Sequence, residues 1–189
     1  MTIYSLFLVF IWFIFIAYWA FSALAAKSNA NAGAWWRGMG LRALLVIIVI
    51  VAARTQFPDA ISAYHPGIAT HPILSGIGVI LAALGIAFAI WARYHLGKNW
   101  GMPMTVKESP DLVTSGPYTF VRHPIYKGVI LALIGTAMVV GGWWALLPLI
   151  YSLYFVYSAR KEEAVMAREF PDQYPGYKAR TKMIIPFIL

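Results

Sequence analysis

Five apolar stretches separated by polar segments dominate the pattern of the chain. The first has 24 residues without a charge, so as a helix rising about 1.5 Å per residue it can cross a hydrocarbon core of ~30 Å. A cleaved signal peptide would need a positive amino-terminal region and a shorter apolar run, and neither is present. The pattern predicts spans at Ile3–Ala26, Leu41–Phe57, Ile73–Tyr94, Ile125–Val140 and Trp143–Ala159.

The last two apolar stretches are joined only by Gly141-Gly142. So short a joint predicts an antiparallel helical hairpin, and the two runs are of similar length, 16 and 17 residues. The far end of the second helix must therefore return beside the start of the first. This predicts that Arg160–Glu163 lies next to Arg122–Pro124.

The composition agrees with a membrane protein. Hydrophobic residues make up 61% of the 189 residues and charged residues 12%, with a mean hydropathy of +0.70. Soluble domains carry roughly 25% charged residues, so soluble and disordered classes are both disfavoured. The chain has no cysteine, which excludes disulfides, thiolate catalysis and cysteine-ligated metals. We expect a single domain over residues 1–189 and an all-α integral membrane fold.

The net charge of +8 indicates orientation in a membrane and not nucleic-acid binding, because the basic residues fall between apolar runs. With five spans and the amino terminus outside, every one of the 15 Lys and Arg residues except Arg54 lies on the cytoplasmic side. Positively charged loops favour that side. We therefore predict a multi-pass protein whose polar segments, residues 93–127 and 160–189, form a small cytosolic cap.

The candidate site is Gly116–Gly128, a basic stretch directly before an apolar run. Pro124 fits the first turn of a helix, whose free N–H groups and dipole favour an anion. Arg122 can bind a carboxylate or phosphate through two hydrogen bonds. Glu162 and Glu163 supply acceptors suited to ribose hydroxyls or an ammonium group. The alternative is structural: Arg122 is then an interface charge, and the two glutamates pair with nearby cations.

Other features indicate no separate site. His65 and His71 are six residues apart in a loop, but Asp59 is the only carboxylate close to them, so we predict no metal site. Gly76 and Gly78 lack the third glycine and the βαβ context of a dinucleotide fingerprint, and favour close helix packing instead.

Three motifs in order carry a family resemblance. They are Leu96-Gly-x-Asn-Trp100, then Leu112-Val113-x-x-Gly116-Pro-Tyr118-x-x-x-Arg122-His-Pro-x-Tyr126-x-Gly128, then Glu162-Glu163 followed by Phe170-x-x-x-Tyr174-x-x-Tyr177. This pattern resembles the isoprenylcysteine carboxyl methyltransferase family, within a broader group that includes membrane phospholipid methyltransferases. The resemblance covers about residues 93–180.

The resemblance implies S-adenosyl-L-methionine as the methyl donor, bound in the cytosolic cap. The implied cofactor-binding residues are Gly116, Tyr118, His123, Pro124, Tyr126, Glu162 and Glu163. Arg122 would lie near the substrate carboxylate or the reacting centre, and Asn99 and Trp100 would close the pocket or contact the substrate. In the family an arginine precedes the glutamate pair by several residues. Arg160, which is closer to the pair, is the candidate here.

The residues expected for such a reaction are few, because an ionised carboxylate attacks the activated methyl group without a general base. Catalysis would then depend on positioning in a dry site. The acceptor would be lipophilic, a prenylcysteine-like molecule entering from the bilayer. The alternatives are phospholipid N-methylation, an NADPH-dependent sterol-type reductase with a similar Arg-His-Pro pattern, and a non-catalytic membrane binding or assembly protein.

Overall fold

The described part of the protein, in a computed structural model, comprises residues 2–23, 71–100 and 111–185. Its helices are α1 (Ile3–Ala23), α5 (Pro72–Leu96), α6 (Pro124–Val140), α7 (Leu146–Glu169) and α8 (Tyr174–Arg180), with the 3-10 turns η1 (Gly97–Asn99), η2 (Gly116–Thr119) and η3 (Gly142–Ala145). Within these residues the only β pairing is an isolated parallel bridge between Val121 and Lys182. The described part is therefore all-helical.

Four of the predicted apolar stretches form long helices, whereas Leu41–Phe57 lies outside the described residues. Two segments, Ile3–Ser22 and Pro72–Asn99, are long and apolar enough to cross a membrane, and α6 is a shorter apolar helix. These features are consistent with a helical membrane protein.

The bounds of α7 differ from the predicted span Trp143–Ala159 at both ends, although the sequence also predicts that Glu162–Phe170 continues as a helix. The helix begins at Leu146 and not at Trp143, because the turn η3, which starts at Gly142 of the glycine joint, precedes it. It continues past Ala159 to Glu169. Polarity ends the apolar run at Arg160, but Arg, Lys, Glu, Ala and Met all have high helix propensity, so the helix itself does not end there.

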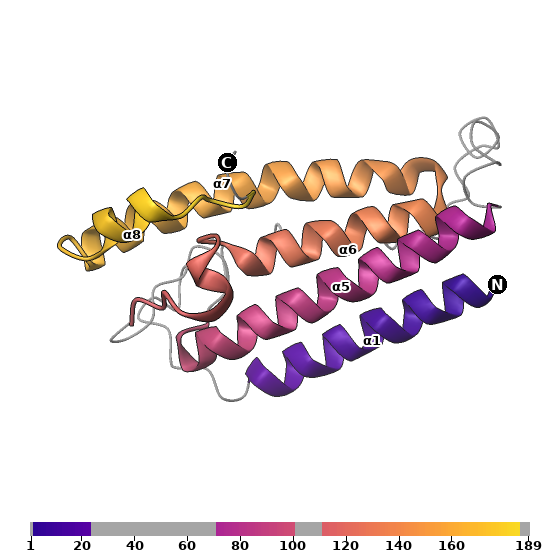
Figure 1. Ribbon diagram of the computed structural model, residues 1–189, viewed down its shortest axis with the longest axis horizontal. Helices are drawn as coiled ribbons and strands as arrows, with labels where there is room; N and C mark the ends of the chain where they lie inside the picture. Colours follow the sequence, from indigo (N-terminus) through magenta and orange to yellow (C-terminus); the bar gives the residue numbers. More distant parts are fainter. Residues whose placement is uncertain (1, 24–70, 101–110, 186–189) are drawn as a thin grey trace, which may run out of the picture.

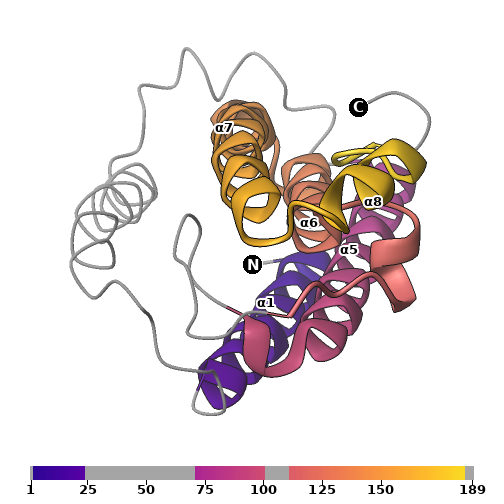
Figure 2. The same ribbon diagram turned by 90° about the vertical axis from the view of Figure 1, so that its left-hand side faces the viewer.

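The long helices lie side by side in one bundle (Figure 1). Helices α5 and α6 are antiparallel, α6 and α7 are antiparallel, and α1 packs along α5. The view along the bundle places α6 between α5 and α7 (Figure 2). The end of α5, the start of α6 and the end of α7 therefore meet at the same end of the bundle, together with α8.

Glycines bring α5 and α6 into the most extensive contact of the bundle. A Cβ on Gly85 would lie 2.6 Å from both the Gly128 oxygen and the Ala132 nitrogen, and one on Gly135 would lie 2.4 Å from the Gly78 oxygen. The two backbones thus touch where side chains are missing, which is the packing typical of small residues in membrane helices. Of the pair Gly76 and Gly78, only Gly78 faces α6, since a Cβ on Gly76 would meet nothing within 4 Å.

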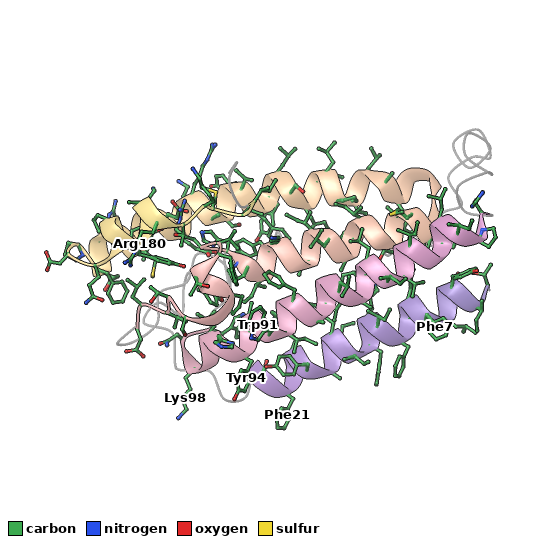
Figure 3. The ribbon with its side chains drawn as sticks, in the orientation of Figure 1. Phe7, Phe21, Trp91, Tyr94, Lys98 and Arg180 are labelled. Atoms are coloured by element: carbon green, nitrogen blue, oxygen red, sulfur yellow. The ribbon has the colours of Figure 1, made fainter. Side chains whose placement is uncertain are left out.

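Helix α1 leaves much of its apolar surface uncovered. Only Leu8 among its described side chains is buried, and Trp12 donates a hydrogen bond to the Thr136 hydroxyl on α6 at 3.0 Å. Phe7 and Phe21 point away from the bundle (Figure 3). Apolar side chains on α7 are also exposed, including Leu149 and Leu153.

Candidate functional site

Arg122 lies at the centre of a buried polar cluster at the start of α6. Its Nε donates to the Glu163 Oε1 on α7 at 2.7 Å. Its Nη1 donates to the backbone oxygens of Lys178, at 3.2 Å, and of Thr181. The predicted proximity of Arg122 to the glutamate pair is therefore present as an ion pair.

Glu163 is held from two sides. Its other oxygen, Oε2, lies 2.9 Å from the Lys178 Nζ, and the residue is only 4% exposed. Burial raises the pKa of Glu163, but the neighbouring His123, Arg122 and Lys178 outweigh it and lower the pKa to about 2. The carboxylate is therefore ionised and anchors α7 to the arginine.

His123 lies between the two glutamates. Its Nδ1 is 3.5 Å from the Glu162 Oε2, and its Nε2 is 3.5 Å from the Glu163 Oε1. Burial lowers the pKa of His123, but Glu162 and Glu163 raise it overall. At this length the contact is weaker than a hydrogen bond, and Nε2 has no hydrogen-bond partner among the described residues. His123 thus has a buried polar atom left for a ligand.

The imidazole of His123 stacks on a row of aromatic rings. The ring of Tyr126 is nearly parallel to that of His123, with centroids 5.4 Å apart, and to that of Phe155, with centroids 4.4 Å apart. The Tyr126 hydroxyl donates to the Glu162 Oε1. Ile184 packs against the same apolar group. Glu162 is thus positioned by a tyrosine whose ring is fixed in the core.

Residues 174–185, which we term the C-terminal strap, pair with the Arg-His-Pro stretch through the backbone. The Arg122 N–H donates to the Lys182 oxygen at 2.8 Å, and the His123 N–H to the Met183 oxygen at 2.9 Å. The Tyr177 hydroxyl donates to the Tyr118 oxygen at 2.8 Å. The strap therefore fixes both the turn η2 and the start of α6.

Tyr174 and Tyr177 belong to one of the three sequence motifs, but no sequence pattern predicts Lys178, Thr181 or Phe155 as neighbours of the site. The backbone pairing of the strap depends on tertiary contacts that no local pattern shows. The aromatic spacing of Tyr174 and Tyr177, both buried, was the available signal.

Glycine, tyrosine and proline at the predicted positions shape the approach to this cluster. Gly116 has a left-handed φ of 58°, and a Cβ there would lie 2.3 Å from the His95 ring on α5. Tyr118 and Pro124 are buried, and Pro124 occupies the first turn of α6 as expected. These residues bring η2 against α5 and leave His123 directly before the helix.

The remaining predicted residues lie elsewhere. Trp100 faces Arg93 on α5, with the Arg93 Cζ 4.7 Å from its ring centroid. The Asn99 Oδ1 accepts from the Asp111 N–H at 3.2 Å. Arg160 is exposed on α7, and in the described part of the chain it takes part in none of the ion pairs of the cluster. The structure thus unites Arg122, His123, Tyr126, Glu162 and Glu163. The hydrogen bonds and ion pairs given for this group include none to Asn99, Trp100 or Arg160.

A comparison with known families decides the affiliation of the chain. The family model described as phospholipid methyltransferase matches residues 74–173, which extend from the first turn of α5 past the end of α7. The chain belongs to the phospholipid methyltransferase family. The match includes every residue of the cluster except those of the C-terminal strap.

Curated relatives of the chain carry two kinds of name. The chain is 33% identical over 101 residues to a protein-S-isoprenylcysteine O-methyltransferase of Schizosaccharomyces pombe, covering 51% of the chain and 43% of the relative. It is 29% identical over 121 residues to the enzyme of that name in Mus musculus, covering 61% and 42%. It is 27% identical over 170 residues to the nickel-cobalt-cadmium resistance protein NccN of Alcaligenes xylosoxydans xylosoxydans, covering 87% and 71%. The chain therefore spans less than half of the length of the two methyltransferases.

Proposed function

We propose that this family member is a multi-pass membrane methyltransferase that uses S-adenosyl-L-methionine and methylates a lipophilic acceptor, the carboxylate of a prenylcysteine-like molecule. The observation that carries the proposal is the buried group formed by His123, Tyr126 and Glu162 at the start of α6. It stands next to the Arg122–Glu163 ion pair. The names of the curated relatives support the same chemistry.

The residues of the cluster fit the methyl donor. His123 has a buried nitrogen without a hydrogen-bond partner in the described part, which suits a polar ligand. Both oxygens of Glu163 are already held by cations of the chain, so we assign the hydroxyls or ammonium group of the donor to Glu162. Glu162 contacts a tyrosine hydroxyl and an imidazole, which a ligand can replace at lower cost than the paired cations of Glu163. Gly116, Tyr118 and Pro124 would line the same pocket.

The chemistry then needs little from acid or base residues. The donor supplies a methyl group on a sulfonium, which is already activated. A bond forms between a carboxylate oxygen of the acceptor and the methyl carbon as the carbon–sulfur bond breaks, giving a methyl ester and S-adenosylhomocysteine. The chain contributes position and exclusion of water. Arg122 serves here by holding η2, α7 and the C-terminal strap together.

The location follows from the distribution of charge and apolar surface. Every Lys and Arg of the described residues lies toward the end of the bundle that holds the cluster (Figure 1). We propose that this end faces the cytoplasm, that the amino terminus lies outside, and that α6 and α7 form a membrane hairpin. The lipophilic part of the acceptor would enter from the bilayer.

Calorimetry on detergent-purified protein tests the proposal. We expect saturable binding of S-adenosylhomocysteine and none of NADPH; the reverse result would favour a reductase and refute a methyltransferase. Methyl transfer to N-acetyl-S-farnesylcysteine but not to phosphatidylethanolamine is expected. Methyl transfer to the phospholipid amine alone would show that the protein is a phospholipid N-methyltransferase instead.

A further inference from the structure

Arg93 is a buried cation that the polar cluster does not use. It lies in the last turn of α5 and is 3% exposed. Its Nη1 donates to the Gly97 oxygen at 2.7 Å, and its Nη2 to the Ser22 oxygen at the end of α1 at 2.6 Å. Its Nε is buried and has no hydrogen-bond partner in the described part of the chain. Among the described residues, no carboxylate forms an ion pair with it.

Such an environment leaves the charge incompletely compensated. Two neutral carbonyls and the face of Trp100, 4.7 Å away, offset part of the cost of removing a guanidinium from water. Buried charges in proteins are otherwise paired with an opposite charge. An ionisable residue within an apolar helix is therefore a candidate binding residue, and an anion would complete this site.

The turn η2, which carries Tyr118, contacts the end of α5, which carries Arg93. Burial, Tyr177 and Glu162 raise the pKa of Tyr118, whereas Arg93 lowers it. Tyr118 is thus within electrostatic reach of both Glu162 and Arg93. A molecule bound at Arg93 would lie beside the group that we assign to the methyl donor.

Arg122, by contrast, has little capacity left for a substrate. Its Nε is taken by Glu163 and its Nη1 by two backbone oxygens of the C-terminal strap. A carboxylate placed there would compete with Glu163 for the same charge. Arg93 on α5, by comparison, is a buried guanidinium without a carboxylate partner among the described residues.

We infer that Arg93 binds the carboxylate of the methyl acceptor, with its Nε as the donor that the fold leaves unused. The inference rests on the proposed function. The ring of Trp100 lies against the same guanidinium, so a ligand there would contact it as well. The exposed rings of Phe21, Trp91 and Tyr94 surround this end of α1 and α5 (Figure 3) and provide apolar surface for the lipophilic part of the acceptor.

The test compares N-acetyl-S-farnesylcysteine with its carboxamide, which has the same shape and no charge. Affinities are measured by calorimetry for wild type, Arg93→Met, Arg93→Lys and the control Lys98→Met. Lys98 is an exposed cation in the adjacent turn η1. We expect wild type and Lys98→Met to prefer the acid by roughly 10- to 100-fold, as for a hydrogen bond to a charged group. Arg93→Met should bind acid and amide equally, and Arg93→Lys should keep part of the preference.

Binding of S-adenosylhomocysteine is measured in the same variants. It should be unchanged within about threefold in Arg93→Met. A large loss of S-adenosylhomocysteine affinity in Arg93→Met, while Arg93→Lys remains folded, would overturn the inference. It would mean that Arg93 binds the carboxylate of the methyl donor and not that of the acceptor. An acid preference that survives in Arg93→Met would also overturn it and leave the proposed function standing. No acid preference in wild type would refute the carboxylate acceptor itself.

Discussion

At the scale of single residues, the two neighbouring glutamates have different environments. Glu163 pairs with Arg122 and Lys178, whereas Glu162 contacts Tyr126 and His123. The sequence presented them as equivalent, because adjacent identical residues carry no local signal of their partners. Only the position of the C-terminal strap, which supplies Lys178, distinguishes them.

This difference predicts that two matched substitutions affect different properties, one the stability of the fold and the other ligand binding. Glu163→Gln leaves the buried Arg122 without its counter-charge and should destabilise the fold by about 3 kcal/mol. Glu162→Gln should leave stability nearly unchanged and weaken S-adenosylhomocysteine binding roughly 10- to 100-fold. Thermal unfolding and calorimetry in detergent measure the two effects. Strong destabilisation by Glu162→Gln, with wild-type stability in Glu163→Gln, would reverse the assignment.

The two pKa shifts also predict a stability maximum in pH. The pKa of Glu163 falls from 4.5 to about 2, so its contribution is complete above pH 4.5 and is lost as the pH falls towards 2. The pKa of His123 is raised above 6.5, so its contribution is complete below pH 6.5 and is lost at higher pH. The melting temperature should therefore be highest between about pH 4.5 and 6.5.

The control for this profile is His123→Gln, which cannot titrate. Its melting temperature should fall less than that of wild type between pH 6.5 and 9. Its acid limb should begin at a higher pH than that of wild type, because His123 is one of the groups that lower the pKa of Glu163. Identical curves on the alkaline side would show that another group causes the decline.

At the scale of the elements, the apolar pattern identified the long helices better than their ends. The long apolar runs predicted the bounds of α1, α5 and α6 to within a few residues. The apolar run predicted at Trp143–Ala159 ends before α7 does, but the polar helix predicted at Glu162–Phe170 is confirmed, since α7 continues to Glu169. The pairing of the C-terminal strap with Arg122 and His123 was not predictable, since an isolated bridge has no periodic signature.

The contact between α5 and α6 predicts a contrast between two glycines of the same helix. Gly85→Ala would place a Cβ 2.6 Å from backbone atoms of α6, so the helices must separate, at a cost of about 1–3 kcal/mol. Gly76→Ala has open space and should be neutral or stabilise by up to about 1 kcal/mol, because alanine favours a helix. Melting temperatures in detergent compare them. Equal effects of the two substitutions would mean that close α5–α6 packing does not limit stability.

At the scale of the whole molecule, the proposed orientation depends on the arrangement of the bundle. The start of α1 and the strap-bearing end lie at opposite ends of it (Figure 1). Cations gather at the strap-bearing end, and such an asymmetry favours the cytoplasm. In this orientation lipid covers the exposed apolar faces of α1 and α7, because apolar surface is more stable in hydrocarbon than in water.

The absence of cysteine allows this orientation to be measured directly. Single cysteines at Thr2 and Gln173, both exposed and at opposite ends of the bundle, provide unique labelling sites. In intact cells an impermeant maleimide should label Thr2→Cys at once and Gln173→Cys only after permeabilisation. The cysteine-free wild type is the control for background. Labelling of Gln173→Cys in intact cells would place the polar cluster outside, where a cytoplasmic methyl donor cannot reach it. Such a result would refute the proposed cytoplasmic site of the reaction and leave the description of the fold unchanged.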